Sequence, residues 1–380
     1  MKICDVVLNS IWYDPRVRKQ IFEYLRNGIE LCCVGYECDR YDVEKVNAIP
    51  CETNIIMSDK SYDTQKKSVF RKIRHFLKME MDIRDAIVAY KPDCIHANDL
   101  NALIPAYWAK KKLKCRLVYD SHEVYVENHT KGALASFIWK CIERYIVHKV
   151  DKMICVSHAA SDYFAKIYKI APPMVVTNCA LRSENIDCLK TIQKNEGFEI
   201  LNHGQFYEGR GYDIMANALP LMIEQPEIKF ALRGFGNMEH MLHESVSKAP
   251  NSEQFRFYPR VSVEELIPEA AKSHVGVAVT VPICLNFEMS ISNKIFEYAA
   301  AGLPVIMSNI PEHRYLNGKY KFGVILKDNT PECFAEAVKK LYADKEFYDV
   351  CCKNAIKLSN ELNWENEFSK LISCEKSLCK

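Results

Sequence analysis

Long apolar runs are missing from this sequence. The chain has 380 residues, of which 48% are hydrophobic and 26% are charged, and no segment is apolar for long enough to cross a bilayer. This composition is ordinary for a globular protein and excludes an integral membrane protein. We expect a protein that is soluble or at most rests on a membrane surface.

Paired cysteine motifs are also missing. The 17 cysteines are scattered without any CxxC pair, and neighbours such as Cys32 and Cys33 lie inside apolar segments. This distribution argues against a disulfide framework and favours reduced, buried thiols. The first residues, MKICDVVLNS, lack the longer apolar core and the small-residue cleavage site of a signal peptide. We therefore expect the protein in the cytoplasm, where it could contact the inner face of the membrane peripherally.

Two phosphate-binding motifs are incomplete. The segment GQFYEGRG, residues 204–211, has Arg210 and Gly211 where a P-loop needs a lysine followed by serine or threonine. In the segment that begins at Gly234, Glu239 replaces the third glycine of a dinucleotide fingerprint. These departures argue against ATP hydrolysis and against a nicotinamide-dependent enzyme.

The chain is longer than one hydrophobic core usually supports, so we expect two domains. Short runs rich in valine and isoleucine alternate with helical patterns twice, which is typical of α/β domains with parallel sheets covered by helices on both faces. In the first half, strands are predicted near residues 3–8, 30–34, 93–96, 115–119, 152–156 and 174–177. In the second half they are predicted near 198–202, 228–232, 255–258, 275–279, 304–307 and 322–326.

The expected domain boundary lies near residue 190. Pro172 and Pro173, followed by a polar stretch over residues 182–197, interrupt the alternation. We therefore expect a first domain over residues 1–190 and a second over 191–360. A final helix over 361–380 carries Trp364, Phe368 and Leu371 on one face, which implies that this tail packs on another part of the molecule.

Helix ends are readable in places. Asp14 can cap a helix whose first residue is Pro15, and Gly28 can end it. Ser262 and Glu265 have the spacing of a capping box.

Polar side chains follow several predicted strands of the first domain. Ligands of doubly wound folds bind beyond the carboxyl ends of the strands, so these loops are candidate sites. Clustered histidines and carboxylates there can bind hydroxyls and tune proton transfer, which makes His122 a functional candidate. Asp99 could instead cap the following helix, together with Asn98. The candidates of this domain are Trp12, Asp14, Arg16, His96, Asp99, His122 and Glu123.

The second domain has two candidate segments. Gly204, Gln205 and Gly211 belong to the first, where glycines permit close backbone approach and Arg210 can make a two-pronged contact with a phosphate.

The other segment runs over residues 290–305 and begins with Ser290, Ile291 and Ser292. The helix start near Ser292 can face a diphosphate. Glu297 can accept hydrogen bonds from two adjacent ribose hydroxyls, or it could pair with Lys294 on the same helical face.

Basic residues gather between residues 66 and 78. They alternate with apolar side chains, so on a helix they would form a basic amphipathic surface suited to anionic lipid headgroups or a charged acceptor. A solvated helix face is the alternative. The basic residues are Lys66, Lys67, Arg71, Lys72, Arg74 and Lys78.

The chain resembles the family 4 retaining glycosyltransferases (glycosyl transferases group 1) over about residues 6–370. The resemblance rests on the order and spacing of five segments: DPRV at 14–17, PDCIHAND at 92–99, VYDSHE at 118–123, RG at 210–211 and NKIFEY at 293–298. It implies the GT-B architecture, with two Rossmann-like domains that face a cleft. The first domain would take the acceptor and the second the nucleotide sugar, with the last helix crossing back onto the first domain.

The resemblance also implies roles for single residues. Glu297 looks like the ribose-binding glutamate, Arg210 like the basic contact to the diphosphate, and Lys294 like a second phosphate contact. His122 looks like the histidine near the transferred sugar. In the retaining mechanism proposed for such enzymes, the donor's own phosphate helps to deprotonate the acceptor, so no protein nucleophile is needed. No Asp-x-Asp motif occurs, and we expect neither a metal nor another cofactor.

Three departures from the family pattern matter. Met289 stands where a first glutamate is common, although Glu288 is one residue away. Gln205 stands where an arginine is common. The first loop lacks the usual paired glycines, and Trp12 and Tyr13 make it bulkier.

We expect a UDP- or GDP-sugar donor, a glycan or lipid-linked acceptor of cell-envelope polysaccharide synthesis, and no nucleic-acid partner. The alternatives are a nucleotide-sugar 2-epimerase of the same architecture and a non-catalytic partner subunit.

Overall fold

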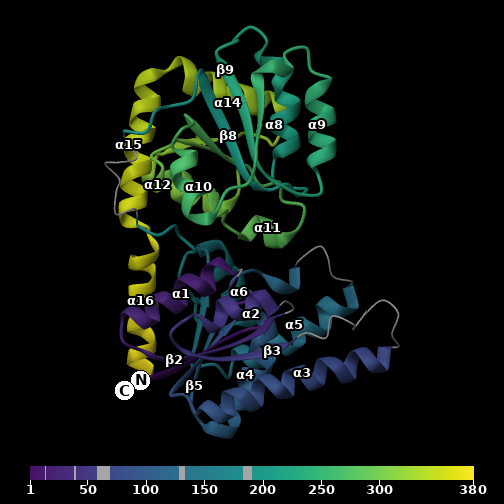
Figure 1. Ribbon diagram of the computed structural model, residues 1–380, viewed down its shortest axis with the longest axis vertical. Helices are drawn as coiled ribbons and strands as arrows, with labels where there is room; N and C mark the ends of the chain where they lie inside the picture. Colours follow the sequence, from purple (N-terminus) through teal and green to yellow (C-terminus); the bar gives the residue numbers. More distant parts are fainter. Residues whose placement is uncertain (13, 38–39, 58–68, 128–132, 183–190) are drawn as a thin grey trace. The chain divides into compact units, whose positions relative to one another are not determined.

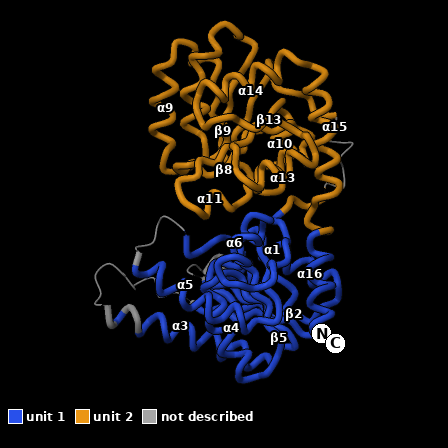
Figure 2. Tube along the Cα trace, turned by 180° about the vertical axis from the view of Figure 1, so that it is seen from behind, with its two compact units in different colours: residues 1–178, 367–380 blue, residues 179–366 orange. Residues whose placement is uncertain are grey.

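The computed structural model describes residues 1–12, 14–37, 40–57, 69–127, 133–182 and 191–380 (Figure 1). The chain divides into two compact units. The first contains residues 1–178 and 367–380, and the second contains residues 179–366 (Figure 2).

The first unit is built on a seven-stranded parallel sheet in the order β3-β2-β1-β4-β5-β6-β7. All six predicted strands are confirmed. One further strand, β3, lies at the edge of the sheet. Its half-exposed positions tolerate polar residues, so the strand lacks the apolar pattern by which the others were predicted. The strands are β1 (Lys2–Val7), β2 (Glu30–Glu37), β3 (Glu52–Met57), β4 (Cys94–Asn98), β5 (Arg116–Ser121), β6 (Lys152–Cys155) and β7 (Met174–Val175).

Helices connect these strands. The N-terminal cap of α1 is confirmed, because an Asp14 side-chain oxygen accepts hydrogen bonds from the backbone N–H groups of Arg16 and Val17. The helices are α1 (Pro15–Arg26), α2 (Arg40–Asn47), α3 (Val69–Tyr90), α4 (Asp99–Leu113), α5 (Ala133–Val147), α6 (His158–Tyr168) and α16 (Trp364–Leu378).

The second unit contains a six-stranded parallel sheet in the order β10-β9-β8-β11-β12-β13. Each of its six predicted strands is confirmed, as is the capping box of Ser262 and Glu265 at the start of α10. The strands are β8 (Phe198–Gln205), β9 (Ile228–Phe235), β10 (Phe255–Tyr258), β11 (Val275–Ala278), β12 (Val305–Met307) and β13 (Gly323–Ile325). The helices are α8 (Tyr212–Ala218), α9 (Glu239–Ser247), α10 (Val263–Ala270), α11 (Leu285–Met289), α12 (Lys294–Ala300), α13 (Pro311–Tyr320), α14 (Pro331–Ala343) and α15 (Lys345–Glu361).

The chain passes between the units earlier than the boundary expected near residue 190. Cys179 is already buried in the core of the second unit, and the backbone N–H of Trp364 donates to the carbonyl of Ala180. The chain returns within α16. Beyond that point the Glu367 carboxylate accepts from the backbone N–H of Thr177 at 2.9 Å, and the ring of Phe368 packs edge-on against Tyr24. The apolar face of the final helix thus covers the first unit.

Within the described ranges, no helix is both long enough and apolar enough to cross a membrane.

Candidate functional site

The first candidate site lies at the carboxyl ends of β4 and β5. Here β1 pairs with β2 on one side and with β4 on the other, so the strand order changes direction at this point. Asn98 at the end of β4 is in register with Asp120 on β5. This is the position at which open α/β sheets place their ligands.

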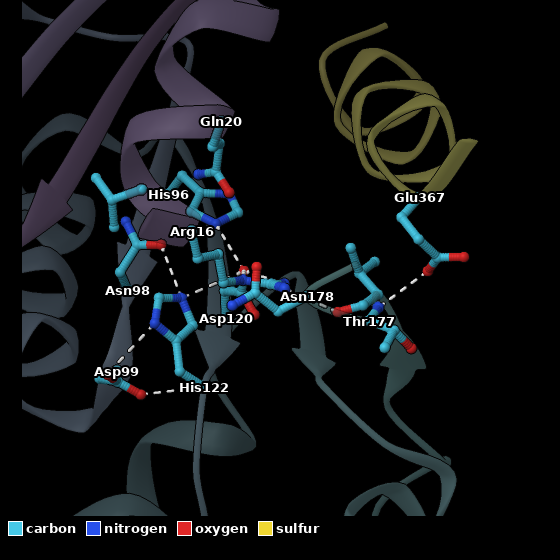
Figure 3. Close-up of polar contacts among 12 residues, drawn as sticks. Arg16, Gln20, His96, Asn98, Asp99, Asp120, His122, Thr177, Asn178 and Glu367 are labelled. Atoms are coloured by element: carbon cyan, nitrogen blue, oxygen red, sulfur yellow. Dashed lines mark hydrogen bonds and ion pairs between the residues drawn. The ribbon is translucent and has the colours of Figure 1, made fainter. Parts of the chain in front are cut away.

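His122 is held by both neighbouring strand ends (Figure 3). Its Nε2 lies 3.1 Å from Oδ1 of Asn98 and 3.6 Å from Oδ2 of Asp120, and its Nδ1 lies 3.5 Å from Oδ2 of Asp99. Asp99 also accepts a hydrogen bond from the backbone N–H of His122 at 2.8 Å. Asp99 adopts a φ of 64°, a conformation that costs free energy in a non-glycine residue and is often found at functional sites.

Asp120 is the fully buried centre of this cluster. Its Oδ2 accepts hydrogen bonds from Nε and Nη2 of Arg16 at 3.0 and 2.7 Å, and it lies 3.4 Å from Nε2 of His96. Arg16 also donates to the carbonyl of Val176. Arg16 is 2% exposed and His96 is 0% exposed, so both expected site residues lie beneath the strand ends and hold Asp120 in place.

The last helix contributes a residue to the same cluster. The carboxylate of Glu375 lies 2.8 Å from Nδ1 of His96 and accepts a hydrogen bond from the Tyr24 hydroxyl at 2.8 Å. All three side chains are buried. A chain of buried polar contacts therefore runs from α16 through His96 to Asp120 and His122.

These contacts fix the charge of the two histidines. Burial opposes protonation of His122, but the carboxylates of Asp99 and Asp120 outweigh it and raise the pKa to about 9. Burial also opposes protonation of His96, but Asp120 and Glu375 raise its pKa to about 10. Both imidazoles are thus cations near neutral pH. A protonated His122 cannot accept a proton, so this arrangement favours electrostatic stabilisation over general-base chemistry.

The other expected residues of the first unit are more peripheral. Trp12 packs below the guanidinium of Arg18, whose central carbon lies 5.4 Å from the ring centroid. The side chain of Asp14 serves the helix cap, and the backbone carbonyl of Glu123 accepts a hydrogen bond from Ser121 Oγ. Tyr13 lies outside the described residues.

The second candidate site lies where β8 and α12 meet. Nε2 of His203 is 2.8 Å from Oε2 of Glu297, and the backbone N–H of His203 donates to the hydroxyl of Tyr298 at 2.9 Å. The rings of His203 and Tyr298 are stacked with centroids 4.4 Å apart. The Glu297 carboxylate is oriented by the buried His203. The Glu297 side chain is itself 25% exposed, so its carboxylate still reaches solvent.

Two basic side chains accompany Glu297. Lys294 is 9% exposed, and its Nζ donates to Oδ1 of Asn202 at 2.8 Å. Burial and the neighbouring charge of Arg210 lower its pKa to about 7. The guanidinium of Arg210 lies over the ring of Phe287, with its central carbon 4.5 Å from the centroid. The site therefore combines one carboxylate with two basic groups in the second unit.

Glycines shape the loops around these residues. Gly204 and Gly211 have φ values of 121° and 71°, and a Cβ atom on Gly211 would lie 2.6 Å from the side chain of Val279. A larger residue at 211 is excluded by both effects. Gly211 caps α8. Gln205 is exposed at the end of β8.

The loop before α12 is mostly buried. Ile291 and Ser292 are 9% and 7% exposed. The Ser290 hydroxyl donates to the carbonyl of Phe287.

Sequence reasoning missed several members of these clusters, among them His203, Asp120 and Glu375. His203 precedes Gly204 at the end of a predicted strand, so the rule that selected His122 would also have found it. Asp120 lies inside the segment VYDSHE, but the sequence indicates a site role only for His122 and Glu123 of that segment. Glu375 had no local signal.

Among the described residues, no group of three or more histidine, cysteine, aspartate or glutamate side chains is placed to hold a metal ion.

Family models match both halves of the chain. Residues 36–181 match the model described as Glycosyltransferase Family 4, and residues 197–344 match the model described as Glycosyl transferases group 1. A stretch of 135 residues is 24% identical to an uncharacterized 42.6 kDa protein in the cps region of Klebsiella pneumoniae. That match covers 32% of this chain and 36% of the relative, so the chain matches about a third of the relative's length.

Solved structures match the whole chain at low identity. HepE from Anabaena, in complex with UDP, is 13% identical over 99% of this chain and 100% of its own, with a TM-score of 0.78. Sucrose-phosphate synthase from Thermosynechococcus elongatus is 14% identical over 100% and 99% of the two chains, with a TM-score of 0.76. A putative UDP-N-acetylglucosamine 2-epimerase from Listeria monocytogenes has a TM-score of 0.64 at 12% identity over 99% and 96%.

The two parallel-sheet units give the fold that the sequence predicted, and the two family matches fall on one unit each. This chain belongs to the group 1, family 4 glycosyltransferases and has the GT-B fold.

Proposed function

We propose that this chain transfers a sugar from a UDP- or GDP-sugar to a glycan or lipid-linked acceptor, with retention of configuration at the anomeric carbon. The observation that carries the proposal is the grouping of Glu297, Arg210 and Lys294 in the second unit. This grouping offers a carboxylate for a ribose diol beside cations for a diphosphate. Similar solved structures support the donor class, because HepE has been solved in complex with UDP, with UDP and glucose, and with UDP-glucose.

The donor would be held by its ribose and by its diphosphate. Glu297, oriented by His203, accepts hydrogen bonds from the ribose hydroxyls. Arg210 and Lys294 bind the diphosphate, on which negative charge grows as the bond between the anomeric carbon and the phosphate oxygen breaks. Charge stabilisation that is already in place lowers the barrier without reorganisation, so these cations act most strongly in the transition state.

The acceptor would bind in the first unit near His122. Its hydroxyl oxygen forms the new bond to the anomeric carbon, and its proton passes to the departing phosphate. Neither a protein nucleophile nor a metal is required by this scheme. The protonated His122, fixed by Asp99 and Asp120, supplies a positive charge at the acceptor site that we propose in the first unit.

Cell-envelope polysaccharide synthesis is the context we propose. The relative in the cps region of Klebsiella pneumoniae supports it.

Thermal unfolding with a panel of nucleoside diphosphates and nucleotide sugars tests the donor assignment. We expect one base and one sugar to raise the melting temperature most, because a ligand that binds the folded state stabilises it by mass action. The anomeric proton signal of that donor is then followed by NMR without acceptor. A donor that stays intact fits a transferase, conversion to its 2-epimer would identify an epimerase, and a panel without any stabilising member would refute the donor site.

A further inference from the structure

One helix of the first unit exposes a continuous apolar face. On α5, Leu134 is 74% exposed, Phe137 65%, Ile138 49% and Tyr145 59%. Leu134 and Phe137 are the two most exposed large hydrophobic side chains of the described residues. Phe137 and Ile138 follow Leu134 by three and four residues, and Tyr145 follows Ile138 by seven, so these side chains lie on one side of the helix. We define this surface, formed by Leu134, Phe137, Ile138 and Tyr145, as the α5 face.

Helix α5 is nevertheless packed against the rest of the first unit. The opposite side of α5 is buried: Ile146 and Val147 belong to the core, and the Glu143 carboxylate accepts hydrogen bonds from the hydroxyls of Tyr119 and Tyr168. The helix is thus apolar on two sides, of which the protein covers one. Scattered exposed hydrophobic residues are normal, but a contiguous patch marks an interaction site.

The neighbouring helix α3 lies against α5 and also exposes apolar side chains. The rings of Phe76 on α3 and Trp139 on α5 meet edge-on with centroids 6.0 Å apart, and Figures 1 and 2 both place the two helices on the same side of the first unit. Leu77 and Met81 on α3 are 44% and 42% exposed.

Basic residues border this apolar surface. At the end of α5, Arg144, His148 and Lys149 are exposed, and the Lys149 ammonium lies 5.8 Å from the ring centroid of Tyr145. Tyr145 contacts Tyr107, over which the Lys111 ammonium lies at 5.9 Å. The exposed basic residues of α3 include Arg71, Arg74 and Lys78.

Acidic residues are scarce on this surface. The single acidic residue in the sequence of α5 is the buried Glu143. The exposed acids of α3, Asp82 and Asp85, lie in its second half, beyond the basic turn. An apolar strip with a basic border and aromatic hydroxyls complements the boundary between headgroups and acyl chains of an anionic bilayer.

We propose that the α5 face inserts into the surface of membranes that contain anionic phospholipids, while the basic residues of α3 and α5 contact lipid phosphates. The basic segment noted in the sequence is then the border of the binding surface, and the α5 face is its centre. Lys66 and Lys67 lie outside the described residues, and the proposal does not depend on them. It also does not depend on sugar transfer, because lipid binding is measured without donor or acceptor.

Vesicle co-sedimentation of the full chain tests this proposal. The probes are vesicles of phosphatidylcholine alone and of phosphatidylcholine mixed with phosphatidylglycerol. We expect the wild type to bind the anionic vesicles more tightly and high salt to weaken that binding, since the lipid charges attract the basic border.

Two variants separate the apolar and basic contributions. Exchange of Leu134→Ser, Phe137→Ser and Ile138→Ser together should weaken binding at least roughly tenfold, because three large apolar side chains no longer leave water. Exchange of Arg74→Gln, Lys78→Gln, Arg144→Gln and Lys149→Gln should remove the preference for anionic vesicles. A matched control, Ile223→Ser, Met241→Ser and Val263→Ser, changes comparably exposed apolar residues of the second unit and should bind like the wild type.

Three outcomes would overturn the proposal. Equal recovery of the wild type with neutral and anionic vesicles is the first, and wild-type binding by the folded serine variant of the α5 face is the second. The third is a wild type that ignores vesicles but self-associates in sedimentation velocity, with the serine variant monomeric, since the face would then bind a second copy. Circular dichroism checks that each variant is folded.

Discussion

Nε2 of His203 lies 2.8 Å from Oε2 of Glu297, which joins the end of β8 to α12 in the second unit. The histidine ring is itself fixed by stacking on Tyr298. Glu297 is therefore held in one orientation before a ligand arrives. This preorganisation reduces the entropy that donor binding must overcome.

Replacement of Glu297 by glutamine should raise the KM for the donor about tenfold or more. The ribose does not change during the reaction, so a lost ribose contact weakens binding of the ground state and of the transition state alike. Steady-state kinetics with varied donor concentration measure this effect. Glu361→Gln, which changes a surface carboxylate bonded to Tyr320 in the same unit, is the control and should leave KM unchanged. An unchanged KM in a folded Glu297→Gln variant would leave a structural pairing as the better explanation of this residue.

Replacement of Arg210 by alanine should act mainly on kcat. Negative charge on the departing diphosphate is greatest in the transition state, so we expect kcat to fall roughly 100-fold. Arg210→Lys should recover part of the loss, because it keeps the charge but not the two-pronged geometry. Lys345→Ala removes a cation from an exposed ion pair on α15 and should be silent. Wild-type turnover in a folded Arg210→Ala variant would refute the assigned diphosphate contact.

Donor affinity should fall as the pH rises above 7. The pKa of Lys294 is lowered to about 7, first by burial and then by the charge of Arg210, so in the free protein this lysine loses its charge as the pH increases. A bound diphosphate favours the protonated form and raises the pKa in the complex. The Kd should therefore rise by up to about tenfold per pH unit above 7 until the pKa of the complex is reached.

Isothermal titration with a nucleotide sugar between pH 6 and 9 measures this dependence, since the diphosphate diester does not itself titrate in that range. Titrations at pH 8 in buffers with different ionisation enthalpies should also reveal proton uptake on binding. Lys294→Met should flatten the profile. A wild-type Kd that is constant between pH 7 and 9 would show that Lys294 does not contact the donor.

Transfer should continue after metal chelation. In the proposed site the cations of Arg210 and Lys294 stabilise the departing diphosphate, so no divalent ion is needed for that purpose. Transfer rates before and after dialysis against EDTA measure the effect. Complete loss of transfer, restored by Mg²⁺ or Mn²⁺, would mean that a metal bridges the diphosphate.

Local patterns were sufficient to predict most of the fold. Buried strands such as β8 are short apolar runs, and their periodicity does not depend on distant residues. The edge strand β3 was missed because its half-exposed face allows Glu52, Thr53 and Asn54, which break the apolar pattern.

The sequence was sufficient to select candidate site residues, but it did not reveal the contacts between them. A rule about strand ends selects His122, and the helix pattern of residues 290–305 selects Glu297 as a ribose-binding candidate. Both depend on neighbouring residues in the chain. The contact of His96 with Glu375 joins residues 279 positions apart, and no local period can reveal it. Similarly, the sequence offers Arg16 only as a candidate that follows a strand, and the fold shows its guanidinium buried against Asp120.

The most direct test of the central claim is the fate of a radiolabelled sugar. The purified chain is incubated with the donor identified by thermal stabilisation and with glycan and lipid fractions from cells. We predict that the label moves into one acceptor fraction, that one nucleoside diphosphate is released per sugar transferred, and that Arg210→Ala strongly slows both. A label that remains in the nucleotide pool with every fraction tested, while the wild type still binds the donor, would contradict the assignment of this chain as a sugar-transferring enzyme.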